Sequence, residues 1–167
     1  MATNLIYMKP GTPIVFKGSG GDAVFTTANL GSAAGRVSAQ YDRGAGTKAK
    51  LHTVIACIQW AATAVINDTA EIYLFESDGT YQEGTVGTSD AELTTDKRSN
   101  AYRLGSVVCD TTSGATNVVA MFRDVVLVQR YLSVGIWNAS ATKNLQNTAN
   151  VSLIIVTPNP DDIQAAA

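Results

Sequence analysis

The stretch Leu51–Trp60 reads LHTVIACIQW and carries apolar residues at odd and even positions alike. In an extended strand, successive side chains point to opposite faces of the sheet. The two faces would hold two sets of residues: Leu51, Ile55 and Cys57 on one, and His52, Val54, Ala56, Ile58 and Trp60 on the other. A strand that is apolar on both faces is typical of the centre of a sheet, or of a strand whose outer face meets a partner.

Shorter runs of the same kind flank this stretch. Arg36–Arg43 alternates with period 2, which predicts one half-buried strand with Val37, Ala39 and Tyr41 on its apolar face. The valine-rich run Val118–Val128 predicts a long strand with a bulge near Arg123-Asp124. The other predicted strands are Ile14–Phe16 and Ala23–Thr27, which form a hairpin across a glycine-rich turn, then Ile72–Phe75, Tyr102–Cys109, Ser133–Trp137 and Val151–Thr157.

These runs predict an all-β protein, an antiparallel β-sandwich of about eight to ten strands with jelly-roll or Greek-key connections. A single domain is expected over residues 13–158, between an N-terminal arm (1–12) and a flexible C-terminal tail (159–167). Residues 78–100 are polar and acidic and form the chief surface excursion, and long loops of this kind are usually functional or flexible. Within it, Ser89–Glu92 fits a capping box, which predicts one helical turn.

The composition favours a surface that other subunits cover. Charged residues make up 16% of the chain, against about 25% in average soluble proteins. The alternative is a stable, weakly charged monomer. The net charge of −2 and the lack of a basic patch give no support for nucleic-acid binding. No apolar run is long enough to span a membrane, and no secretory signal is visible, so we expect synthesis in the cytoplasm.

Residues that usually carry chemistry are few. His52 is the single histidine, and its apolar surroundings favour a core or interface role over general-base catalysis. Cys57 and Cys109 lie in separate apolar runs, which favours buried free thiols, with a disulfide as the alternative if their strands are neighbours. One histidine and two isolated cysteines do not supply a zinc site. We therefore expect no enzyme, no catalytic or metal-binding residues and no cofactor.

Two further readings remain open from the residues alone. The loop acids Glu76, Asp78, Asp90 and Glu92 could hold calcium through oxygen ligands, although solvated loops are the commoner use of such residues. Trp60 and Trp137 could stack on sugars if exposed, but burial in the core is favoured.

Several segments share their order and spacing with one known family. They are Phe16–Ala23, Glu71–Thr80, Gly87–Glu92, Trp137–Ser140 and Thr157–Asp162, within a likeness that runs from about Pro13 to Ile163. Together they resemble a family of small structural proteins of tailed bacteriophages. The resemblance implies a virion protein, with a head decoration or cement protein favoured. Such proteins are often β-sandwiches or jelly rolls that assemble as dimers or trimers on the capsid surface and clamp neighbouring major capsid subunits.

The N-terminal arm is the candidate interface. Its apolar residues Leu5, Ile6, Tyr7 and Met8 could add a strand to the exposed sheet edge of a neighbour. Two other functions stay open, namely a carbohydrate-binding or receptor-binding domain and a head-fibre or tail component of the virion.

Overall fold

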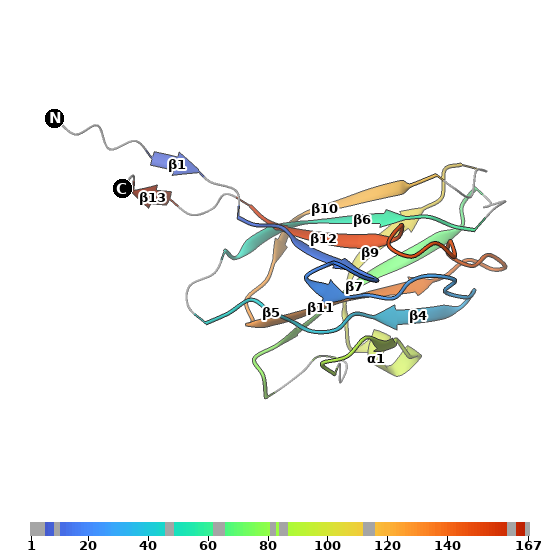
Figure 1. The fold of residues 1–167 in the computed structure, drawn as a ribbon, viewed down its shortest axis with the longest axis horizontal. Helices are drawn as coiled ribbons and strands as arrows, with labels where there is room; N and C mark the ends of the chain where they lie inside the picture. Colours follow the sequence, from blue (N-terminus) through green and yellow to red (C-terminus); the bar gives the residue numbers. More distant parts are fainter. Residues whose placement is uncertain are drawn as a thin grey trace.

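Alternating apolar residues fold this chain into two β-sheets that pack face to face, which confirms the predicted β-sandwich (Figure 1). The computed structural model describes residues 6–8, 11–45, 49–61, 66–80, 83, 87–111, 116–159 and 163–165. Nearly all strand pairs within the two sheets are antiparallel.

Sheet I contains the stretch that is apolar on both faces. Its strands, in spatial order, are β10 (Val118–Val126), β6 (Leu51–Ile58), β12 (Leu153–Pro158), β2 (Ile14–Lys17) and β3 (Ala23–Val24). Since β6 pairs with β10 on one side and with β12 on the other, its predicted place at the centre of a sheet is confirmed.

Sheet II faces the inner side of sheet I. Its strands, in spatial order, are β8 (Ala91–Glu92), β4 (Ala34–Val37), β11 (Tyr131–Asn138), β7 (Thr69–Ser77) and β9 (Tyr102–Val108), and β5 (Tyr41–Asp42) also pairs with β11. The chain passes from one sheet to the other between β6 and β7, and again at each step from β9 to β12. Most connections between consecutive strands therefore cross from one sheet to the other.

The main core fills the space between the sheets. It consists of the side chains that point inward from the strands of both sheets, together with aromatic residues near the ends of strands. The largest fully buried side chains are Trp60, Phe16, Phe25, Ile58, Ile72, Leu74, Leu93, Leu127, Leu132, Ile136, Leu145 and Ile154. All of these except Leu93 belong to the main core. Burial of each large apolar side chain contributes about 1.5–3 kcal/mol.

The predicted hairpin of Ile14–Phe16 with Ala23–Thr27 is wrong, because β2 and β3 run parallel. The Asp22 carboxylate accepts a hydrogen bond from the backbone N–H of Val15 at 2.7 Å, and the Asp22 N–H donates to the Val15 carbonyl at 2.8 Å. These bonds hold the glycine-rich loop against the start of β2. As a result, β3 begins at the same end of the sheet as β2 and runs in the same direction.

The predicted single strand Arg36–Arg43 is also divided, because the chain leaves the edge of β11 after Ser38 and returns to it only at β5. The backbone N–H of this buried serine donates to the Val134 carbonyl in sheet II, whereas the next N–H, of Ala39, donates to Val24 in sheet I. As a result Val37 lies in a cluster on the outer side of sheet II, while Ala39 and Tyr41 pack on the main core. The prediction that these three residues share one face is wrong.

The bulge predicted in the long valine-rich strand is confirmed. The register of β10 against β6 shifts between Phe122 and Val125. Within the bulge Asp124 adopts a left-handed backbone conformation with φ of 56°.

The surface excursion is partly built into the fold. Ala91–Glu92 pairs with β4 as the edge strand β8, so the helical turn predicted at Ser89–Glu92 is wrong. The helix α1 (Thr95–Ser99) begins further along, where the Thr94 hydroxyl accepts a hydrogen bond from the N–H of Lys97 at 3.3 Å. A capping threonine can end a strand pair and start a helix within a few residues.

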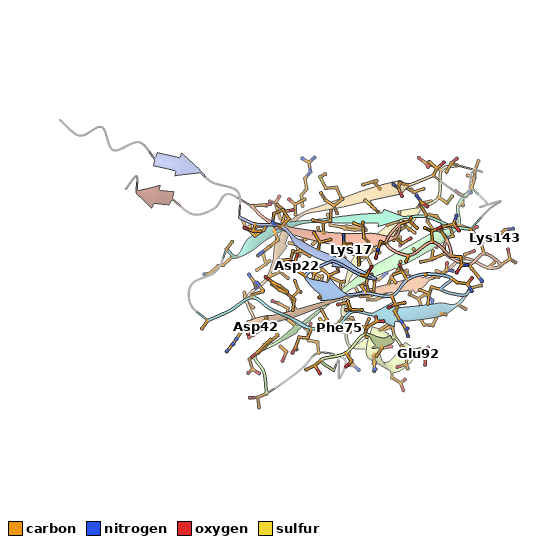
Figure 2. All side chains as sticks on the ribbon, in the orientation of Figure 1. Lys17, Asp22, Asp42, Phe75, Glu92 and Lys143 are labelled. Carbon is orange, nitrogen blue, oxygen red and sulfur yellow. The ribbon has the colours of Figure 1, made fainter. Side chains whose placement is uncertain are left out.

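Leu93, between β8 and α1, fills a second apolar cluster on the outer side of sheet II. This outer cluster consists of Val37, Tyr73, Phe75 and Leu93, all of them buried. Figure 2 shows Phe75 and Glu92 on the side of the molecule that carries α1, and Lys17 and Asp22 nearer to β2 and β3. The part of the excursion from β8 to α1 therefore covers the outer cluster on sheet II.

Two glycines make room for Leu93. A Cβ atom at Gly35 would lie 2.8 Å from the Leu93 carbonyl oxygen and 2.7 Å from Trp137 Cε3. A Cβ atom at Gly135 would lie 2.9 Å from the Phe75 ring. The close approach of the excursion to β4 and β11 therefore depends on the missing side chains.

The first and last described strands form a separate pair. β1 (Ile6–Met8) and β13 (Ile163–Ala165) make a two-stranded antiparallel ribbon, called here the terminal ribbon. Figure 1 shows it extending from one end of the sandwich.

The substitution Gly35→Ala should lower the free energy of unfolding by about 1–3 kcal/mol, because the added methyl group overpacks against the backbone at Leu93. Urea unfolding followed by circular dichroism measures this change. The control is Gly31→Ala, whose Cβ would make only contacts of 4.0 Å. Equal stability of the two variants would contradict the tight contact between the excursion and sheet II.

Candidate interaction surfaces

The terminal ribbon contains the predicted arm residues. Ile6, Tyr7 and Met8 form β1 and pair with Ala165, Gln164 and Ile163 in that order. The fourth predicted residue, Leu5, lies outside the described residues. Part of the segment expected to be a flexible tail thus forms β13, for which the sequence offers little signal beyond one isoleucine.

The ribbon is a separate sheet next to sheet I in the chain. β1 leads into β2 and β13 follows β12, and β2 and β12 are themselves antiparallel neighbours. Among the described strands, β1 and β13 pair only with each other. A two-stranded ribbon is marginally stable alone, and its outer edges carry backbone groups that suit strand addition to a partner.

The outer face of sheet I is a second candidate surface. Register places Cys57 of β6 beside Val119 of β10 and Leu153 of β12, and places Ile55 beside Met121 and Ile155. Of these side chains, Val119 is 54% exposed and Met121 is 50% exposed. We call this surface the bare face.

The bare face has few charges. The only charged residues in the five strands of sheet I are Lys17 at the end of β2, and Arg123 and Asp124 in the bulge of β10. Strands β6 and β12 contain none. The middle of the bare face is therefore uncharged.

The outer face of sheet II differs, because a polar network holds the excursion on it. The two carboxylate oxygens of Glu71 contact Arg103 Nη2 at 3.1 Å and Arg98 Nη1 at 3.3 Å. The Tyr73 hydroxyl donates to the same carboxylate at 2.5 Å. The Arg98 guanidinium lies 4.1 Å from the centroid of the Trp137 ring, which gives a cation–π contact between α1 and β11.

Burial and the hydrogen bond to Glu71 raise the pKa of Tyr73 to about 12. A perturbed pKa is a common sign of an active site, but structural ion-pair networks produce it as well. Here Arg98 belongs to the excursion, whereas Glu71, Tyr73 and Arg103 belong to strands of sheet II and fix the carboxylate that Arg98 contacts. We therefore interpret it as a clamp for α1.

His52 is buried beside a guanidinium. Arg43 Nη2 lies 3.4 Å from His52 Nε2, and His52 Nδ1 lies 3.2 Å from the Lys50 carbonyl oxygen. Because a guanidinium only donates, Nε2 must accept and Nδ1 must carry the proton that it donates to Lys50. Arg43 also donates to the carbonyls of Gln129 and Ala49, both at 2.8 Å, and burial lowers its pKa. The pair ties the start of β6 to neighbouring loops.

Two small pockets lie near these elements. One, of about 350 Å³, is lined by Leu74, Glu76, Glu83, Tyr102, Asp124, Val126 and Leu127. Its Glu76 carboxylate accepts hydrogen bonds from the N–H groups of Val128 and Gln129, both at 2.9 Å. The other, of about 250 Å³, is lined by Thr12, Ile14, Tyr41, Arg43, Ala49, His52 and Pro158. The Glu76 carboxylate of the first pocket and the Arg43 guanidinium of the second thus already make structural hydrogen bonds.

The acids considered for calcium are separated. Glu76 binds the turn before β11, whereas Asp90 forms an ion pair with Arg36 at 3.3 Å and accepts from the N–H of Thr26. In the described part of the chain, no group of three or more His, Cys, Asp and Glu residues could hold a metal ion. No helix among the same residues has the length and apolar character needed to cross a membrane.

The two cysteines lie on different sheets and are free thiols. Cys109, which follows β9, is buried, and its thiol donates to the Thr111 carbonyl at 3.0 Å. Cys57 lies half-buried on the bare face, and desolvation raises its pKa.

The two tryptophans offer little surface to a sugar. Trp60 is 1% exposed and belongs to the main core, as predicted. Trp137 is half-buried, and Arg98 covers one face of its ring.

Sequence reasoning missed Asn138, which is fully buried at the end of β11. Its amide group donates to three carbonyls, those of Leu30, Gly31 and Lys143, at 2.7–3.2 Å. Its side-chain oxygen accepts from the N–H of Ser140. Asn138 thus joins two loops at the end of the sandwich, and an asparagine directly after an apolar strand was the available signal.

No protein-family model matches this chain, and no curated protein matches it.

Tyr73→Phe should lower the free energy of unfolding at neutral pH by about 1–2 kcal/mol, because it removes a hydrogen bond to a carboxylate. The folded-state pKa of Tyr73 is raised from 10.0 to about 12, so its contribution is complete below pH 10 and is lost as the pH approaches 12. The difference between wild type and variant should therefore shrink over this range in urea titrations.

The matched control is Tyr102→Phe, since Tyr102 lies on neighbouring β9 with its side chain exposed. Its stability should equal that of the wild type at neutral pH. A Tyr73→Phe variant with unchanged stability would contradict the clamp.

Proposed function

We propose that this chain is a non-enzymatic virion protein of a tailed bacteriophage, a decoration or cement protein that binds the outer surface of the capsid. It would stabilise the shell by bridging major capsid subunits and by associating with itself as a dimer or trimer. The family resemblance described above suggests the role. The observation that carries the proposal is the terminal ribbon, which extends from a well-packed sandwich with its outer edges available.

The architecture suits a protein that works by contact. A rigid body that makes several weak contacts at once gains affinity through its high effective concentration at each further contact. The terminal ribbon can add a strand to a neighbouring subunit, because main-chain hydrogen bonds at a sheet edge need no particular side chains. The low charged fraction of 16% reduces the cost of removing water from large contact surfaces.

Deletion of residues 1–9 should weaken attachment to capsids that lack this protein while leaving the β-sheet circular dichroism unchanged. Because β1 pairs with β13, deletion of residues 160–167 should weaken attachment to a similar extent. Co-sedimentation of each variant with capsids measures the bound fraction. Attachment that survives both deletions would exclude the terminal ribbon as the contact.

The copy number in purified virions tests the position of the protein. A decoration protein is present in hundreds of copies in each particle, whereas a tail or head-fibre component is present in few. Quantitative mass spectrometry of virions distinguishes the two, and a low copy number would contradict decoration.

A further inference from the structure

The two outer faces of the sandwich are treated differently by the chain. On sheet II, Leu93 and α1 cover the outer cluster, and the Glu71 network holds them in place. On sheet I, four of the most exposed large apolar residues lie on the strands themselves: Val24, Val119, Met121 and Val126. Figure 1 shows α1 beside β4, on the side of the molecule away from β10 and β6.

We propose that the bare face is a self-association surface, on which a second copy of this chain packs with its own bare face. The inference deepens the proposed function, because it names the surface through which the protein would associate with itself. It also accounts for the apolar outer side of β6, where Ile55 and Cys57 alternate with the buried core residues.

The size of the bare face fits such a partner. The four longer strands, β10, β6, β12 and β2, contain nine, eight, six and four residues. At about 3.4 Å per residue and about 4.8 Å between strands, they give a flat projection of about 440 Å². Side-chain relief makes the accessible area larger, which approaches the roughly 800 Å² per partner of a standard interface. Monomers rarely expose apolar patches beyond a few hundred Å².

The charge of the bare face favours an identical partner. With β6 and β12 free of charged residues, a partner rich in lysine or glutamate would have to bury unpaired charges against them. A second copy brings the same uncharged, twisted sheet, and two such sheets pack face to face at about 10 Å. The net charge of −2 per chain gives little repulsion between copies.

This geometry closes as a dimer. When a surface contacts the same surface of another copy, a two-fold axis relates the two chains. Both copies of the surface are then buried, so no further chain can bind there. Figure 1 shows the terminal ribbon beyond one end of the sandwich, so it can remain accessible in the dimer.

The test compares Val119→Lys with Val108→Lys. Both valines lie on strands and are exposed, by 54% and 46%, but Val119 lies on the bare face and Val108 lies on β9 of sheet II. Sedimentation velocity of the purified chain should show a dimer for the wild type and for Val108→Lys. Val119→Lys should raise the dimer dissociation constant at least about a hundredfold, because two lysines would be buried without partners.

A second measurement uses the unmodified chain. Cys57 should react with iodoacetamide more slowly in concentrated, dimeric protein than after dilution to monomer, because the partner would cover it. Buried Cys109 serves as the internal control for unfolding, and its reaction should stay slow at both concentrations.

A wild-type monomer at all concentrations, a trimer, or equal effects of the two lysine substitutions would overturn this proposal. Since these measurements use the protein without capsids, they are independent of the capsid co-sedimentation above. One outcome would overturn self-association but leave the proposed function standing. In it, the wild type and the Val119→Lys variant are both monomers, and only the variant fails to bind capsids. The bare face would then be the surface that contacts the capsid.

Discussion

The inward burial of alternate side chains on β6 and β12 against those on β7 and β11 is the constraint on which this molecule depends. Period 2 sends every second side chain of these strands to the outside of the sandwich. In both sheets many of those outward residues are apolar, as with Tyr73 and Phe75 in sheet II and Ile55 and Ile155 in sheet I. Two outer faces therefore need cover as well as the core.

The chain covers one of these faces with its own residues. Leu93 reaches the outer cluster because Gly35 and Gly135 lack side chains, and the carboxylate of Glu71 holds Arg98 above it. The polar excursion is thus anchored on sheet II by the burial of one leucine, Leu93. The other face has no such cover among the described residues, which makes an external partner the natural means of burying it.

Sequence patterns predicted the elements better than their connections. The apolar residues on both faces of Leu51–Trp60 were enough to predict a central strand, and the bulge at Arg123-Asp124 followed from the interrupted valine run. The parallel pairing of β2 with β3 was not predictable, because it depends on the bonds between Asp22 and Val15. The interruption of the strand after Ser38 likewise depends on contacts with distant Val134 and Val24.

The candidate surfaces were predictable to a smaller extent. An apolar arm can be read from Ile6–Met8, but its partner strand Ile163–Ala165 carries too little pattern to be recognised. The sequence indicated that β6 could face a partner, yet only the pairing with β10 and β12 brings Val119 and Leu153 to the same surface as Cys57. Long-range register of this kind is set by tertiary packing and cannot be read from local periodicity.

Hydroxyl-radical footprinting with mass spectrometry tests the different cover of the two outer faces most directly, because it reports the solvent exposure of individual side chains. In dilute protein, Met121 and Leu153 of sheet I should be oxidised readily, whereas Leu93 and Phe75 of sheet II should be protected. Similar oxidation of Leu93 and Leu153 would contradict the account, since it would mean that the excursion leaves sheet II as open as sheet I.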